Sequence, residues 1–178
     1  YIVYENHTRN KELLKYAQTD ALTGLYNKET TEQLTDELLS EDENKYHAFL
    51  ILDVDCFKQI NDIYGHAVGD IVLQKFGKLL KGTFREGDIL GRIGGDEFGV
   101  IMKNIQTKDI AMKKAEELLA KTQAYKIDEL KGNNISISIG ISTAPQDGDC
   151  YMDLYKRADQ ALYQAKRSGK ARVCNYFS

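Results

Sequence analysis

The chain has 178 residues, of which 42% are hydrophobic and 29% charged, and its formal net charge is −3. These values are typical of one globular domain with a full core, and the small negative charge gives no electrostatic reason to expect nucleic acid or an anionic membrane as partner. No apolar run is long enough to span a bilayer, and no signal peptide is visible. The odd number and wide spacing of Cys56, Cys150 and Cys174 favour reduced thiols in a cytoplasmic protein.

Residues 1–18 carry Leu13, Leu14 and Ala17 among many polar residues, and we interpret them as the end of a connector helix. So short a helix is marginal alone, and a frayed terminus fits the sequence as well as a connector that carries a signal and pairs two protomers. The chain starts at Tyr1 without methionine, so we expect the cytoplasmic part of a longer sensor protein. Residues 19–178 are expected to form its catalytic domain.

The first strand is predicted from the apolar run 48–55, which ends in Asp53 and Asp55. An uninterrupted apolar run of this length predicts a strand that is buried on both faces. Because side chains alternate across a strand, the two carboxylates are expected on one face. A carboxylate at the end of a buried strand is costly unless a cation or hydrogen-bond donors meet it. We take Asp55 as structural.

A hairpin is predicted where two short apolar runs flank Gly94-Gly95 and the acids Asp96 and Glu97. Tight hairpin turns need positive φ, which glycine reaches without steric penalty, so we expect these two glycines to supply it. A solvated turn is the common role of such a sequence. If this turn lies beside Asp53, however, the three acids form an oxygen-only site that suits magnesium and phosphoryl transfer.

The remaining elements follow from hydrophobic periodicity. Helices are expected at 29–40, 56–63, 69–82, 107–125 and 151–167. The 107–125 helix is expected to bury Ile110, and 135–141 to form a strand with one covered face. A short strand at 171–177 closes the chain. This order predicts an α+β fold with a ferredoxin-like βαββαβ palm, in which helices flank a mainly antiparallel sheet, plus an extra N-terminal helix and a C-terminal helix and strand.

Several segments carry recognisable motifs in a fixed order. They are the DALTGLYN of 20–27, the DVDCFKQIND of 53–62, the GH and GD of 65–70, the GGDEF of 94–98, and the segments 138–140 and 158–166. Together the motifs resemble the GGDEF domain, the diguanylate cyclase family, over residues 19–175. The resemblance also implies an ion pair between Asp20 and Arg92.

The resemblance implies a diguanylate cyclase, which condenses two GTP molecules into cyclic di-GMP and releases two pyrophosphates. Each protomer of a head-to-head homodimer would hold one GTP, with two magnesium ions, or manganese in their place. The implied catalytic residues are Asp53, Asp96 and Glu97, which with the carbonyl of Val54 would hold the metal. Asp96 is the expected proton acceptor. Neither nucleic acid nor direct membrane contact is implied.

Nucleotide contacts are implied as well. The resemblance assigns Lys58, Lys166 and Lys170 to the phosphates, Asn61 and Asp70 to the guanine edge, and His66 to the ribose or base. The chemistry fits, because an Asp can accept from guanine's ring N–H and amino group while an amide offers both a donor and an acceptor. A capping or core role fits His66 equally well. Lys170 stands where the family has arginine, so it keeps the charge but loses the bidentate fork.

Arg85 and Asp88 match the family's RxxD inhibitory site, which binds cyclic di-GMP. Arginine can pair with phosphate or stack on guanine, and Asp can accept from the base, although most such pairs are surface ion pairs. Some members add an arginine from the following helix. Here that region has Glu116 and Glu117, which weakens the case for strong product inhibition.

Two other functions stay open. A catalytically silent module would bind GTP or cyclic di-GMP and signal through its upstream helix, although silent members usually lose signature acids that are present here. An adenylyl or guanylyl cyclase would act on one nucleotide, and for that class Asn61 and Asp70 favour guanine over adenine.

Overall fold

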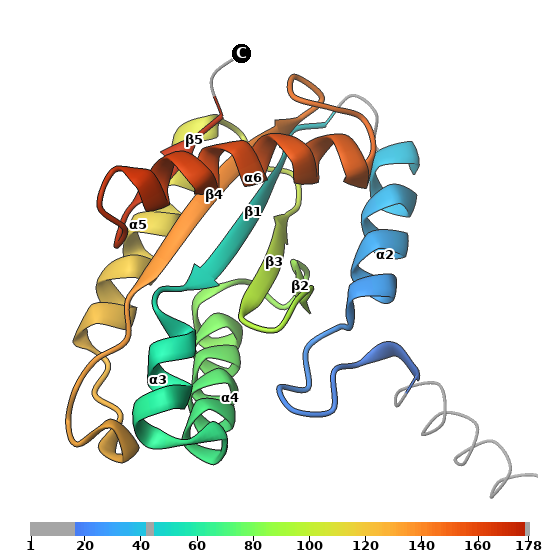
Figure 1. Cartoon of the computed structure of the whole chain (residues 1–178). Helices are drawn as coiled ribbons and strands as arrows, with labels where there is room; N and C mark the ends of the chain where they lie inside the picture. Colours follow the sequence, from blue (N-terminus) through green and yellow to red (C-terminus); the bar gives the residue numbers. More distant parts are fainter. Residues whose placement is uncertain (1–16, 42–44, 177–178) are drawn as a thin grey trace, which may run out of the picture.

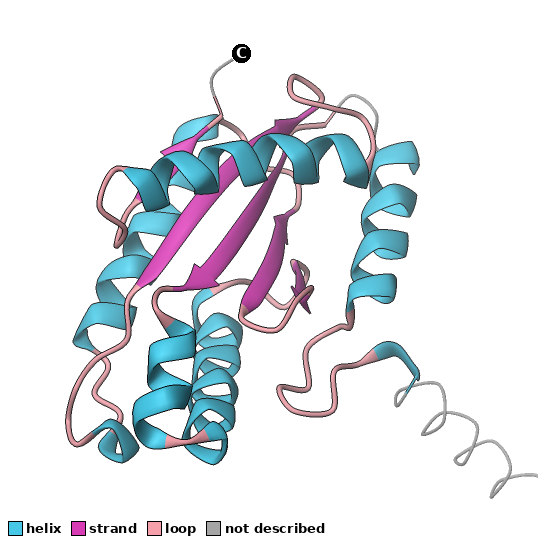
Figure 2. Ribbon diagram, viewed as in Figure 1, coloured by secondary structure: helices cyan, strands magenta, loops and turns pink. Residues whose placement is uncertain are grey.

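The computed structural model describes residues 17–41 and 45–176, which form a five-stranded sheet with helices on both faces (Figures 1 and 2). The strands are β1 (His47–Val54), β2 (Ile89–Arg92), β3 (Glu97–Met102), β4 (Ile137–Ala144) and β5 (Val173–Asn175). Their order is β2-β3-β1-β4-β5, and every neighbouring pair is antiparallel except β4 with β5. The predicted α+β fold with a mainly antiparallel sheet is therefore confirmed.

Five α-helices and one short 3-10 helix pack around the sheet in the described part of the chain. They are α2 (Lys28–Glu41), α3 (Phe57–Tyr64), α4 (His66–Thr83), α5 (Lys108–Ala124), η1 (Asp128–Leu130) and α6 (Tyr151–Arg167). Helix α6 crosses one face, with α2 at its end, while α4 and α5 cover the other (Figure 1). None of the helices in 17–41 and 45–176 has both the length and the apolar character needed to cross a membrane. The expected connector, 1–18, lies outside the described residues except for its last two.

The central strand β1 is buried along its whole length, as the apolar run predicts. Its two rows of side chains enter different cores. Leu50 and Leu52 pack among residues of α4 and α5, whereas Phe49 and Ile51 pack among residues of α6 and α2. Asp53 continues the row of Phe49 and Ile51, so its carboxylate emerges on the α6 side, where the strand ends.

Strand β4 differs from its prediction, because both of its faces are buried. The residues that alternate with its large apolar side chains are small, and they lie under α6. A Cβ added to Gly140 would stand 2.1 Å from the main-chain oxygen of Ala158, and the Ser142 hydroxyl donates to the oxygen of Leu154 at 2.8 Å. Alternation here separates small from large side chains, and α6 can pack closely because of it.

One helical position was also predicted wrongly. Ile110, near the start of α5, is 38% exposed, whereas the next residue, Ala111, is fully buried. The helix turns Ile110 away from the sheet toward the loop that contains Arg85, and both residues line one surface cavity.

Candidate active site

Pairing of β1 with β3 brings the three predicted acids together. The register sets Asp53 opposite Glu97, and the Val54 N–H donates to the carbonyl of Asp96 at 3.2 Å. Asp53 is buried, with 7% exposure, while Asp96 and Glu97 are partly buried. Two segments that are distant in the sequence thus place three carboxylate side chains at one end of the sheet.

Burial and mutual repulsion disfavour the charged forms of Asp53 and Glu97. Burial raises the pKa of Asp53 above its ordinary value; the Lys166 ammonium opposes that shift, and the Asp96 and Asp55 charges add to it. Burial also raises the pKa of Glu97, and the charge of Asp53 contributes. Acids whose pKa is raised by burial and by one another gain most from a divalent ion. The oxygen-only donor set fits magnesium or manganese.

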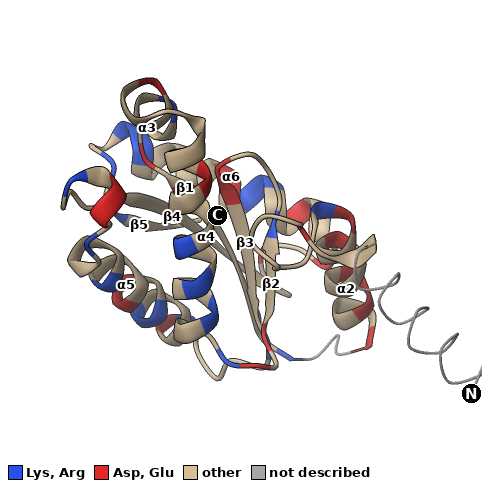
Figure 3. Cartoon of the chain, turned by 90° about the horizontal axis from the view of Figure 1, so that it is seen from below, with Lys and Arg blue, Asp and Glu red and all other residues tan. Residues whose placement is uncertain are grey.

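Two lysines near the end of α6 face this cluster. Lys166 Nζ lies 2.8 Å from Asp53 Oδ2, and Lys170 Nζ lies 3.1 Å from Cys56 Sγ, directly after β1. Figure 3 looks onto this edge, where acidic and basic positions of α6 and the strand ends lie close together. An anionic ligand that bound beside the acids would therefore meet two positive charges, those of Lys166 and Lys170.

The turn between β2 and β3 is built differently from its prediction. Neither Gly94 nor Gly95 has a φ in the left-handed region. The N–H groups of Ile93 and Gly94 both donate to the oxygen of Glu97, so the loop is longer than a two-residue turn and needs no positive φ. A Cβ on Gly94 would meet Glu97 Oε2 at 3.1 Å, whereas one on Gly95 would meet nothing within 4 Å. Gly94 therefore leaves room for the Glu97 side chain, and Gly95 leaves the main chain at the tip of the loop without a side chain.

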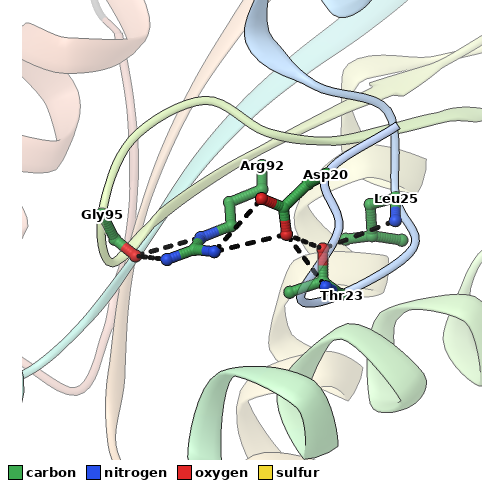
Figure 4. Close-up of polar contacts among 5 residues, drawn as sticks. All are labelled: Asp20, Thr23, Leu25, Arg92 and Gly95. Carbon is green, nitrogen blue, oxygen red and sulfur yellow. Dashed lines mark hydrogen bonds and ion pairs between the residues drawn. The ribbon is translucent and has the colours of Figure 1, made fainter. Parts of the chain in front are cut away.

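An ion pair braces this turn from the N-terminal segment, as the resemblance implied (Figure 4). Arg92 Nη1 lies 3.2 Å from Asp20 Oδ2, and Arg92 Nη2 donates to the Gly95 oxygen at 2.8 Å. The Thr23 hydroxyl and N–H also donate to Asp20. Burial acts to raise the pKa of Asp20, but the bonds from Thr23 and Arg92 outweigh it and hold that pKa below its ordinary value. The segment 20–23 is thus tied directly to the turn with the acids.

The residues assigned to guanine lie at the junction of α3 and α4. Asn61 Oδ1 is buried and has no hydrogen-bond partner among residues 17–41 and 45–176, and a Cβ on Gly69 would stand 1.9 Å from it. Asp70, the next residue, is exposed. His66 is the exposed first residue of α4, which excludes a core role, and Lys58 is exposed on α3.

Arg85 and Asp88 form an ion pair with each other. Asp88 is 8% exposed, and its carboxylate accepts from Arg85 Nη2 and from the N–H of Lys103, both at 3.1 Å. The Arg85 side chain is 62% exposed and lines two surface cavities of 630 and 510 Å³. Arg85 can therefore reach a ligand, whereas Asp88 can accept from one only after releasing its present donors.

The 510 Å³ cavity is lined by basic side chains to which the sequence assigned no role. Lys113 and Lys114 lie there with Arg85, and Glu117 is paired with Lys114 at 2.8 Å and with Lys121 at 2.6 Å. These bonds lower the pKa of Glu117 to about 2. The spacing of three and four residues on a helix was the available signal for this pairing. Glu116 and Glu117 on α5 therefore do not remove the positive charge of this cavity.

Comparison with known proteins decides the family. The family model described as "Diguanylate cyclase, GGDEF domain" matches residues 17–172. The chain belongs to the GGDEF domain family. Diguanylate cyclase A of Treponema denticola is 37% identical over 170 residues, which are 92% of this chain and 46% of that protein. The response regulator PleD of Caulobacter vibrioides is 37% identical over 177 residues, 96% of this chain and 39% of that protein. The chain spans less than half the length of both relatives.

Solved GGDEF structures share the fold. The coiled coil and GGDEF domain of DgcB from Caulobacter crescentus, in complex with c-di-GMP, matches with a TM-score of 0.88 at 25% identity, over 97% of this chain and 93% of that one. The GGDEF domain of TpbB from Pseudomonas aeruginosa matches with a TM-score of 0.84 at 33% identity, over 89% and 94% of the two chains. The sheet and helices described above are thus those of the GGDEF fold.

Proposed function

We propose that this GGDEF domain is a diguanylate cyclase that condenses two GTP molecules into cyclic di-GMP and releases two pyrophosphates. The main support is the register that sets Asp53 opposite Glu97 in a chain whose signature is intact. Relatives named as diguanylate cyclases, at 37% identity for the protein from Treponema denticola, support the same activity.

Asp53, Glu97, Asp96 and the carbonyl of Val54 would hold the metal. When bound, magnesium neutralises phosphate charge and lowers the pKa of the attacking 3′-hydroxyl. Asp96 lies at the turn, only partly buried, and accepts the proton of that hydroxyl. Lys166 moves from Asp53 to the phosphates as the nucleotide arrives, because the phosphates then offer more negative charge than one carboxylate.

Different residues would hold the phosphates and the base. Lys58 and Lys170 contact the phosphates, while Asn61 and Asp70 read the guanine edge. Each domain has one such set of residues and holds one GTP. The reaction joins two nucleotides, so it takes two domains arranged with their sites facing each other, as a homodimer.

Incubation with GTP and magnesium, followed by chromatography of the products, tests the proposal. We expect cyclic di-GMP from the wild-type chain, and a loss of about a hundredfold or more in Asp96→Ala and Glu97→Ala, because each removes a carboxylate that would hold the metal ion. Asp109→Ala is the matched control, an exposed acid in the first turn of α5 that should keep wild-type turnover.

Near-normal rates in Asp96→Ala and Glu97→Ala would remove the metal assignment. A wild-type chain that binds GTP or cyclic di-GMP but yields no product, even as a forced dimer, is instead a silent binding module. A product that contains one nucleotide would identify a mononucleotide cyclase.

A further inference from the structure

Asp55, two residues beyond the metal-site acid Asp53, is held in a dense set of hydrogen bonds. It is 7% exposed. Its carboxylate accepts from the hydroxyls of Ser136 at 2.6 Å and Ser138 at 2.7 Å, and from the N–H of Ala171 at 3.1 Å. The carboxylate therefore joins the end of β1 to the start of β4 and to the segment after α6.

The segment that Asp55 holds is a turn with unusual backbone angles. Lys170 and Ala171 are consecutive, and both lie in the left-handed region, with φ of 61° and 49°. Residues that carry a Cβ adopt this conformation at a cost, and it persists where the surrounding contacts fix it. One such contact is the hydrogen bond that the Ala171 N–H donates to the carboxylate of Asp55, which follows β1.

This turn determines where the Lys170 ammonium lies. Lys170 Nζ is 3.1 Å from Cys56 Sγ, and Cys56 directly follows Asp55. Hydrogen bonding to Cys56 raises the pKa of Lys170, and the charges of Asp55 and Asp53 add to this. Residues 55 and 56 thus contact both the Lys170 ammonium and the main chain of the residue after it.

We propose that Asp55 is a positioning residue for nucleotide binding: its carboxylate fixes the Lys170–Ala171 turn and so holds the Lys170 ammonium where the phosphates of GTP bind. The proposal rests on the proposed function, which assigns Lys170 to the phosphates. It replaces a purely structural role for Asp55 with an effect on ligand affinity that passes through Lys170.

The test compares Asp55→Ala with Lys170→Ala and with the double variant, in binding and in kinetics. Binding of 3′-deoxy-GTP, which cannot condense because it lacks the attacking hydroxyl, is measured by calorimetry. We expect each single variant to bind about tenfold more weakly, the loss typical of one charge-assisted contact, and the double variant to bind no more weakly than Lys170→Ala. KM for GTP should rise more than kcat falls.

Two variants separate positioning from general stability. Asp147→Ala is the matched control, since Asp147 is 5% exposed and accepts from the N–H and hydroxyl of Thr143 toward the other end of β4. It should lower stability and keep the affinity for 3′-deoxy-GTP. Asp55→Asn should keep most of the affinity, because its oxygen can still accept from Ala171.

Hydrogen exchange of the Ala171 amide supplies a readout without nucleotide. Exchange should accelerate in Asp55→Ala and stay unchanged in Asp147→Ala. If Asp55→Ala does not fold, the double variant Ser136→Ala, Ser138→Ala loosens the same carboxylate and should shift exchange and affinity in the same direction.

Wild-type affinity in Asp55→Ala, wild-type affinity in Lys170→Ala, or fully additive losses in the double variant would each overturn the proposal. So would unchanged exchange at Ala171. If the wild-type chain does not bind 3′-deoxy-GTP, the proposed function fails, and the exchange measurement still decides whether Asp55 anchors the turn.

Discussion

Lys166 occupies the position of a cation beside Asp53, and its ammonium lies 2.8 Å from Oδ2. Any divalent ion that binds Asp53 has to compete with this charge. At the proposed site, this ion pair would couple metal binding to nucleotide binding, because the phosphates would offer Lys166 another anion to pair with.

Lys166→Met removes this competitor while keeping the length of the side chain. We expect the affinity for Mn²⁺ without nucleotide to rise about fivefold, the effect of one partly buried ion pair, and the affinity for 3′-deoxy-GTP to fall. Electron paramagnetic resonance of free Mn²⁺ measures the first quantity.

Arg167→Met is the control for this variant, since Arg167 is exposed and lies over the ring of Tyr163. It should leave Mn²⁺ binding unchanged. Equal or weaker Mn²⁺ binding in Lys166→Met would show that the lysine does not compete with the metal.

Single residues were the hardest features to predict from the sequence. The pairing of Asp20 with Arg92 spans 72 positions and came only from the resemblance. The partners of Asp55 lie more than 80 positions away, and no local pattern marks them. Local chemistry predicted that a carboxylate at the end of a buried apolar strand needs a cation or hydrogen-bond donors, and in the structure the Lys166 ammonium meets Asp53.

At the scale of the elements, β4 and α6 pack closely, and glycine makes this contact possible. A Cβ on Gly140 would lie 2.4 Å from the Leu162 nitrogen and still closer to the Ala158 oxygen, both of them main-chain atoms of α6. Helix α6 carries Lys166 near its end, so its distance from the sheet also sets the distance from that lysine to Asp53.

Gly140→Ala should lower the free energy of unfolding by about 1–3 kcal/mol, because the helix must move to admit the methyl group. Gly82→Ala is the matched control within α4, where an added Cβ meets nothing within 4 Å. It should stabilise the protein by about 0.5–1 kcal/mol through helix propensity. Urea denaturation measures both, and a neutral Gly140→Ala would contradict the close packing.

Prediction of the elements succeeded where the pattern had one physical meaning. The run 48–52 is apolar throughout and lies in the central strand, and the Gly94-Gly95 region does join two antiparallel strands. It failed where one pattern has two meanings. In β4, small side chains under α6 alternate with large apolar ones, which is the same pattern that polar surface residues give. In the turn, glycine supplies space for a side chain and not positive φ.

At the scale of the whole molecule, one chain carries one set of proposed nucleotide-binding residues, and the proposed product contains two nucleotides. The relatives are more than twice as long, and DgcB was solved with a coiled coil next to its GGDEF domain. The proposed reaction therefore requires two domains to meet.

Turnover per chain should accordingly rise with protein concentration. A parallel dimeric coiled coil fused ahead of residue 17 should raise the rate at low concentration, and a monomeric helix of equal length is the control. A specific rate that is independent of concentration in a chain shown to be monomeric would contradict the two-domain reaction.

The most direct test of the central claim is a crystal structure of the chain with magnesium and 3′-deoxy-GTP. We predict a metal ion about 2.0–2.1 Å from carboxylate oxygens of Asp53 and Glu97, with the triphosphate beside it and the guanine against Asn61 and Asp70. A nucleotide bound elsewhere, such as in the cavities beside Arg85, with no ion at the three acids, would contradict the account.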